Sequence, residues 1–284
     1  MLAPVLAVVL PIALRALFRA DLDVYDARDE RLFHHPTIQA FAAALPRPDL
    51  SDYPSATGPL YHLLLAPICA WSGDSLLALR LATLALALAG LVLVAALVVR
   101  SSSAPWWGLS LLLLPLGLSP YFLGPAVRLS TDDAALTFVV LALLALDRAR
   151  RRDWDPAVML LAATAAAAAL LTRQVHGWLV GVLALAPWIP APRVGHRPST
   201  RRLAAAATSV VPVAAFAPLV ALWGGPTPPS FAEHDAGLNV EVLQTELAVL
   251  GALALPVAPW LLRALGPRGR IGALVGGALG GGLL

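Results

Sequence analysis

The chain has 284 residues, of which 59% are hydrophobic and only 13% are charged, and its mean hydropathy is +0.77. These values lie well outside the range of soluble domains, so the composition indicates a protein of the lipid bilayer. The formal charge of +3 comes from arginine without any lysine. Arginines beside apolar runs are typical of contacts with anionic lipid head groups, so we expect no nucleic-acid partner. The single cysteine, Cys69, excludes an internal disulfide and a cysteine metal cluster.

The apolar runs predict an all-α fold, a polytopic bundle of transmembrane helices that forms a single domain over residues 1–284. The expected spans cover residues 2–18, 76–99, 106–124, 131–147, 157–190, 203–223 and 240–263, with 157–190 forming a hairpin of two short spans. The first run has neither a basic flank nor a clear cleavage site, which favours a retained span over a signal peptide. The tail 271–284 stops before a full crossing, so we expect the chain to be cut off within a bundle.

The distribution of charge sets the expected orientation. Four loops rich in arginine alternate with turns that hold most of the acids and five of the six histidines. Basic loops stay cytoplasmic. We therefore expect a multi-pass inner-membrane protein whose polar, active face is periplasmic or extracellular.

Residues 59–72 are apolar but too short to cross a bilayer comfortably. A crossing there would also turn the arginine cluster 148–152 outward. We therefore expect 59–72 to lie at the outer interface. Residues 19–75 then form a long outward-facing catalytic loop that carries short juxtamembrane helices between its prolines.

The strongest local signal is the segment 25–36, which follows the first span. Asp29 and Glu30 are candidate general bases, because a nearby low-dielectric boundary raises the proton affinity of a carboxylate. His34 and His35 are candidate substrate-binding residues beside them. The alternative interpretation is a solvated acidic loop without chemistry.

Two further segments supply weaker candidates. Asp52 and Tyr61 belong to a stretch in which Gly58-Pro59 predicts a turn into the interfacial helix, and this junction is also explained without function. Asp132 and Asp133 open the span 131–147, with Arg128 close by. Capping and the helix dipole explain one aspartate at this position better than two.

An arginine between two apolar segments is usually functional or paired. Arg173, with Gln174 and His176, occupies such a turn, and its guanidinium suits a lipid phosphate. The alternative is a salt bridge to Asp132 or Asp133 that holds the bundle together. His234, in the loop 224–239, is a further candidate for contact with a phosphate or a sugar. No spaced ligand set predicts a metal site.

These segments, in this order, resemble the GT-C membrane glycosyltransferases that use polyprenyl-phosphate sugars. The closest likeness is to the family that adds the terminal α-1,2-glucose to the lipid-linked N-glycan precursor from dolichyl-phosphate-glucose. The residues that carry the likeness are Asp29-Glu30, Phe33-His34, Pro36, Gln39, Asp52 to Tyr61, Ser130 to Asp132, Arg173 to His176, and Gly224 to His234. The sequence departs from the family by one residue between Glu30 and Phe33, reverses Gly58-Pro59, and has His176 where the family has asparagine.

Other GT-C relatives, the aminoarabinose and protein mannosyl transferases, have a similar interfacial helix followed by a span entry like Ala78 to Leu81. The resemblance implies transfer of a hexose, with glucose favoured, from a polyprenyl-phosphate donor to a lipid-linked or cell-envelope glycan. It implies Asp29 or Glu30 as the base, Arg173 with Arg128 or His234 at the departing phosphate, and no metal or cofactor. The alternatives are a transporter or flippase component and a truncated, non-catalytic homologue.

Overall fold

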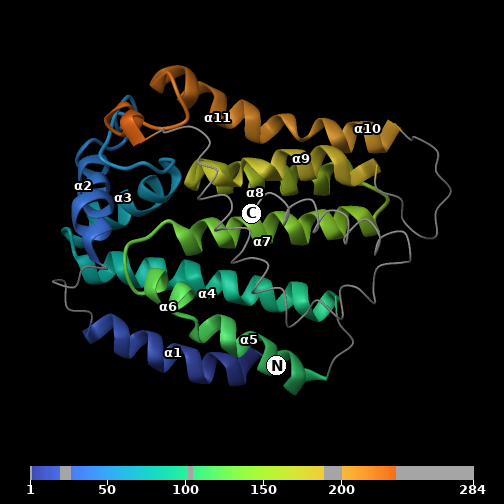
Figure 1. Cartoon of the computed structure of the whole chain (residues 1–284), viewed down its shortest axis with the longest axis horizontal. Coiled ribbons are helices and arrows are strands. Elements are labelled where there is room, and N and C mark those ends of the chain that lie inside the picture. The colour runs from blue at the N-terminus through green and yellow to red at the C-terminus, as the bar shows by residue number, and fades with distance from the viewer. Residues whose placement is uncertain (1, 20–26, 102–104, 189–199, 235–284) are drawn as a thin grey trace, which may run out of the picture. The chain divides into compact units, whose positions relative to one another are not determined.

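The computed structural model describes residues 2–19, 27–101, 105–188 and 200–234 (Figure 1). Most of these residues are helical, and no β-strand occurs among them. Residues Met1–Ala232 form one compact unit, and Glu233–Leu284 form a second. The expected span 240–263 and the tail 271–284 lie outside the described residues.

The helices fall close to the apolar runs of the sequence. In chain order they are α1 (Leu2–Arg19), the π-helical turn η2 (Glu30–His34), α2 (His35–Ala43), α3 (Leu60–Ser72), α4 (Leu76–Ser101), α5 (Trp106–Leu118), α6 (Pro120–Ala126), α7 (Asp132–Arg151), α8 (Pro156–Thr172), η3 (Gln174–Gly177), α9 (Trp178–Leu185), η4 (Ala186–Trp188), α10 (Thr200–Ala207), α11 (Val210–Trp223) and η5 (Pro229–His234). The predicted helix at 59–72 and the predicted break at Arg173 are confirmed.

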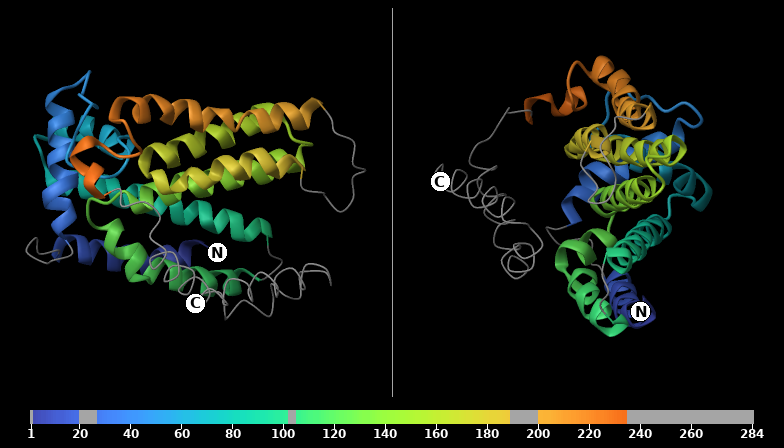
Figure 2. Two further views of the ribbon diagram at one scale, coloured as in Figure 1. Left: turned by 45° about the horizontal axis from the view of Figure 1, so that its top comes forward. Right: turned by 90° about the vertical axis from the view of Figure 1, so that its right-hand side faces the viewer.

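Four long helices of the first unit pack in sequence, α4 on α7, α7 on α8, and α8 on α11. Figure 1 shows them as a row of nearly parallel rods with α2 and α3 at one end. In Figure 2, α2 stands almost at right angles to the row. The start of α7 and the ends of α8 and α11 therefore meet α2 and α3 at the same end of the unit.

Among the described residues, two stretches are long and apolar enough to cross a bilayer, Leu76–Arg100 with 25 residues and Thr200–Trp223 with 24. The bent pair α5 and α6 adds a third if it counts as one span. Large apolar side chains such as Trp107, Leu111 and Val213 are exposed on these helices. Such side chains belong in lipid, so the helices indicate that the protein associates with a membrane.

The single straight span expected at 106–124 is wrong in detail. α5 ends at Leu118, α6 begins at Pro120, and the two axes differ by 61°. Pro120 has no backbone N–H with which to continue α5. Ser119 is extended instead, and its hydroxyl accepts a hydrogen bond from the Tyr121 amide at 3.2 Å, which caps α6. The bend lets α6 contact both α4 and α7.

Candidate active site

A cleft of about 980 Å³ opens at the end of the unit where α2 and α3 lie. It is formed by four parts of the chain: the first loop with η2, the α6–α7 region, the break after α8, and the loop after α11. Its lining residues are Asp29, Glu30, Phe33, His34, Ser55, Ala56, Thr57, Pro120, Tyr121, Gly124, Pro125, Arg128, Leu129, Ser130, Thr131, Asp132, Arg173 and Phe231. The structure thus brings together six of the residues that the sequence predicted for a site.

Glu30, at the start of η2, is buried and its carboxylate is held by hydrogen bonds. It is only 2% exposed, and its carboxylate accepts hydrogen bonds from Arg80 Nε at 3.0 Å and Arg80 Nη2 at 2.5 Å. The Leu129 amide donates a third hydrogen bond at 2.7 Å. Arg80 is equally buried, in the first turns of α4. One carboxylate therefore joins the first loop, α4 and the turn before α7.

Asp29 precedes Glu30 in the chain but has the opposite environment. Its side chain is exposed and lines the cleft. It does not cap η2, and it makes no hydrogen bond or ion pair with the residues that the structure describes. The fixed position of Glu30 holds the backbone of Asp29 at the cleft wall. Asp29 is thus the acid with free lone pairs for a ligand.

Arg173 forms an ion pair with Asp132 across the cleft, between the end of α8 and the start of α7. Both side chains are partly exposed, at 32% and 48%. Ser130 Oγ donates a hydrogen bond to the other Asp132 oxygen at 2.8 Å. The salt bridge that the sequence offered as an alternative for Arg173 is therefore present. It faces solvent, where an ion pair is weak and can be exchanged for a ligand.

His34 lines the cleft, but it is only 8% exposed. Its Nδ1 lies 3.0 Å from Nε2 of His62, on α3. Burial lowers the pKa of His34 to about 4, against the raising effects of Asp29 and Glu30. Arg173 adds to the lowering. His34 is therefore uncharged near neutral pH.

The loop after α11 is fastened to the first loop beside the cleft. Asp52 accepts hydrogen bonds from the Ser230 amide at 3.0 Å and hydroxyl at 2.5 Å, and these lower the pKa of Asp52. Gln174 Nε2 donates to the carbonyls of Ala56 and Pro226, each at 3.0 Å. Asp52 and Gln174 thus hold loops in place, and neither lines the cleft.

Gly58 brings the first loop against the end of α8. A Cβ at this position would collide with the backbone carbonyl of Leu171. The absence of a side chain therefore permits the contact that keeps Ser55 to Thr57 close to Arg173 on the cleft wall.

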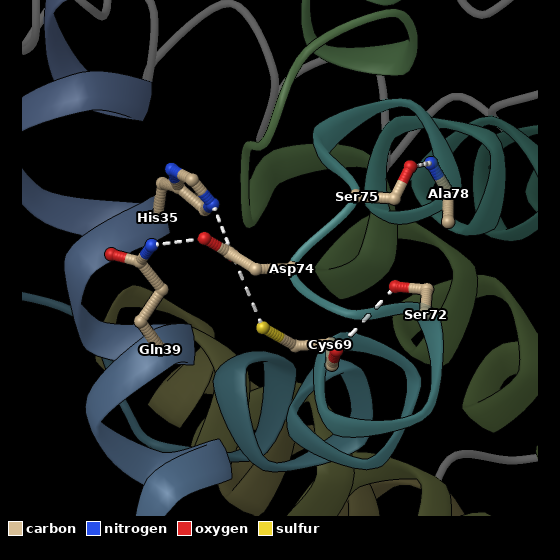
Figure 3. Close-up of polar contacts among 7 residues, drawn as sticks. All are labelled: His35, Gln39, Cys69, Ser72, Asp74, Ser75 and Ala78. Carbon is tan, nitrogen blue, oxygen red and sulfur yellow. Dashed lines mark hydrogen bonds and ion pairs between the residues drawn. The ribbon is translucent and has the colours of Figure 1, made fainter.

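His35, the first residue of α2, does not line the cleft. Its Nε2 is 2.9 Å from Asp74 Oδ1, and Gln39 Nε2 donates to the second oxygen of Asp74 at 2.5 Å. Cys69 Sγ also donates to Asp74, at 3.4 Å. Figure 3 shows His35 and Gln39 of α2 pointing toward Asp74, in the turn between α3 and α4. This cluster fastens α2 to that turn.

Three other predicted site residues, Tyr61, Asp133 and His176, do not line the cleft. Tyr61 is fully buried, and its hydroxyl bonds to Thr83 Oγ1 at 2.7 Å. Asp133 is buried on α7, and His176 is half-buried in η3. His234 closes η5, and its side chain lies outside the described residues. No group of three potential metal ligands occurs in the part of the chain that the structure describes.

Two residues that the sequence did not predict for a site support residues of the cleft without lining it. Arg80 supports Glu30, and an arginine inside an apolar run is the kind of signal that indicates a buried partner. His62 contacts His34, but its place on an apolar helix gives no sign of that contact in the sequence.

No protein-family model, curated protein or solved structure matches this chain. The function is therefore inferred from the residues of the cleft and from the apolar helices that carry them.

Proposed function

We propose that the protein is a membrane glycosyltransferase of the GT-C type, which moves a hexose from a polyprenyl-phosphate donor to a glycan acceptor. One observation carries the proposal. The cleft places an exposed carboxylate, Asp29, and an exchangeable arginine, Arg173, at the same end of a set of long apolar helices. A lipid-linked sugar phosphate needs this combination of a base, a cation and an apolar surround.

In the proposed reaction, Asp29 removes the proton from an acceptor hydroxyl. The hydroxyl oxygen attacks the anomeric carbon, and the bond from that carbon to the phosphate oxygen breaks with inversion. The electron pair leaves with the lipid phosphate. Arg173 neutralises this developing charge by exchanging its bond with Asp132 for the phosphate. Arg128, which also lines the cleft, adds positive charge to the same region.

The structure favours Asp29 over Glu30 as the base. Glu30 already accepts three hydrogen bonds, two of them from a buried arginine. Proton transfer to such a carboxylate would break a buried ion pair, which is costly. Asp29 has no such partner among the described residues and needs no rearrangement to reach a hydroxyl.

The setting that we propose is a multi-pass inner membrane, with the cleft on the periplasmic or extracellular side. Arginines lie in the last turns of two helices, at the ends far from the cleft. These are Arg100 in α4 and Arg148, Arg150 and Arg151 in α7. Basic helix ends stay cytoplasmic, so the cleft end faces outward. The acceptor in this setting is a lipid-linked or cell-envelope glycan, and glucose is the favoured sugar because of the sequence resemblance.

The test is transfer from a panel of radiolabelled polyprenyl-phosphate hexoses to membrane glycolipid, using purified protein in detergent. The Arg173→Ala variant should lose about 10²- to 10³-fold in rate, the effect of removing one donor to a developing oxyanion. The Arg151→Ala variant, which removes an exposed arginine at the other end of α7, is the matched control. Absence of transfer from every donor, with labelled substrate instead crossing proteoliposome membranes, would replace the enzyme with a transporter.

A further inference from the structure

His34 and His62 form a buried pair whose geometry goes beyond packing. The rings stack at 28° with centroids 5.3 Å apart, and Nδ1 of His34 faces Nε2 of His62 at 3.0 Å. His62 has no exposed surface. Two nitrogens at this distance share one proton, so one ring donates and the other accepts.

The charged and titratable groups around His34 come from several elements. They are Asp29 and Glu30 in the adjoining turn, Arg173 after α8, and Tyr61 and His62 on α3. Burial outweighs all of them and keeps the His34 ring neutral above about pH 4. The pKa of His62 is held well below its ordinary value by burial, with His34 as a second cause. Both rings are therefore neutral at physiological pH, and each carries one N–H.

The direction of the shared hydrogen bond follows from the second nitrogen of His62. That nitrogen, Nδ1, is buried and has no hydrogen-bond partner among the described residues. The Gly58 backbone favours a proton on the His62 ring, and because Nε2 already faces His34, Nδ1 is the nitrogen that is left to carry this proton. A proton on Nδ1 leaves Nε2 of His62 as an acceptor. His34 then donates from Nδ1, and its own Nε2 carries only a lone pair.

The lone pair on His34 Nε2 is therefore available to a ligand in the cleft. His34 lines the cleft beside Asp29, and its Nδ1 is occupied by His62. A neutral acceptor and a carboxylate attract hydroxyl hydrogens and repel anions. The arginines that suit an anion, Arg128 and Arg173, lie on other elements of the cleft wall.

We infer that the part of the cleft formed by Asp29 and His34 is a binding site for an uncharged, hydroxyl-bearing ligand such as a sugar. His34 Nε2 accepts a hydrogen bond from one ligand hydroxyl, and His62 is the positioning residue that fixes the His34 tautomer. The identification of this ligand as the sugar acceptor rests on the proposed function. The state of the His34 ring does not.

The test uses diethyl pyrocarbonate, which reacts with an accessible imidazole nitrogen that carries a lone pair. The His35→Gln protein, in which glutamine can still donate to Asp74, leaves His34 as the reporter in this segment. The protein is treated in detergent at pH 5 and pH 7.5, and modification of His34 is measured by peptide mass spectrometry. N-acetylhistidine in the same tube is the control for an ordinary imidazole.

We expect His34 to react at nearly the same rate at both pH values. The free imidazole should slow by about 30-fold at pH 5, because its pKa is about 6.5. Methyl glucoside at high concentration should slow the reaction at His34, and inorganic phosphate should not. Protection by phosphate alone would overturn the assignment of a hydroxyl site. Equal rates without additive, with methyl glucoside and with phosphate would do the same.

Failure of His34 to react at either pH would show that Nε2 carries the proton, and would overturn the tautomer. A fall in the rate of His34 modification at pH 5 as large as that of N-acetylhistidine would show that the ring becomes charged. This result would also overturn the tautomer. The role of His62 is tested by substitution. His62→Leu should slow modification severalfold, whereas His62→Gln, whose amide oxygen can accept the same hydrogen bond, should restore it. Equal rates of His34 modification in the two variants would show that His62 does not position His34. None of these measurements needs transferase activity.

Discussion

Among the described residues, the buried pair Glu30–Arg80 and the cleft pair Asp132–Arg173 share a chemistry and differ in environment. Glu30 and Arg80 are buried, and the carboxylate accepts a third hydrogen bond from the chain. Asp132 and Arg173 face the cleft and are partly exposed. Burial makes the first pair a joint between three segments, because neither charge has water to replace its partner. Exposure leaves the second pair free to exchange with a ligand.

The largest effect that this comparison predicts is the loss of one partner from the buried pair. Glu30→Ala or Arg80→Ala should destabilise the protein by about 3–5 kcal/mol, because each leaves an unpaired buried charge. Thermal unfolding in detergent measures the change. The double replacement Glu30→Met with Arg80→Leu should cost less than either single one. A single variant that unfolds at the wild-type temperature would contradict the structural role of the pair.

The second effect is a pH dependence caused by the buried histidines next to this joint. The pKa of His34 is about 4 in the folded protein and about 6.5 when unfolded, so the unfolded state binds more protons between these values. Stability should be complete above pH 6.5 and fall by about 3 kcal/mol as the pH drops toward 4. His62 acts in the same direction. A His34→Gln variant should show a shallower fall in unfolding temperature over this range.

A third, smaller effect concerns the seam between the first loop and α8. Gly58→Ala should cost about 1–3 kcal/mol, the usual penalty of overpacking, because its Cβ meets the Leu171 carbonyl. Gly181→Ala, on α9, is the matched control, since nothing lies within 4 Å of its added Cβ. Equal unfolding temperatures for the two variants would argue against this close approach.

The smallest expected effect on stability comes from the exposed pair. Asp132→Asn should change stability by less than about 1 kcal/mol, because the pair is screened by solvent. The contrast with Glu30→Ala, measured in the same unfolding assay, tests the comparison as a whole. An Asp132→Asn variant as unstable as Glu30→Ala would make both pairs structural.

The helices could be predicted from the sequence because apolar runs have the length and composition of bilayer helices. The grouping of Asp29, Asp132 and Arg173 could be predicted as well, since polar turns between such runs gather at helix ends. The bend between α5 and α6 was accessible through Ser119-Pro120, a pair that favours a helix start over a continuous span.

The separate roles of neighbouring residues could not be predicted. Asp29 and Glu30 are adjacent, as are His34 and His35, and successive residues on a helix point about 100° apart. In each pair, therefore, one member is buried and the other is more exposed, fully for Asp29 and partly for His35. Which one is buried depends on Arg80 and on His62, partners that follow 50 and 28 residues later in the chain.

The most direct test of the central claim is the transfer rate of Asp29→Asn, measured beside its thermal unfolding. Asn has nearly the same shape but cannot take a proton, and Asp49→Asn is the control for an exposed acid of the same loop outside the cleft. We expect a loss of about 10²- to 10⁴-fold in transfer for Asp29→Asn, with an unchanged unfolding temperature. Full transfer by Asp29→Asn, at a donor concentration at which wild type is active, would contradict this expectation.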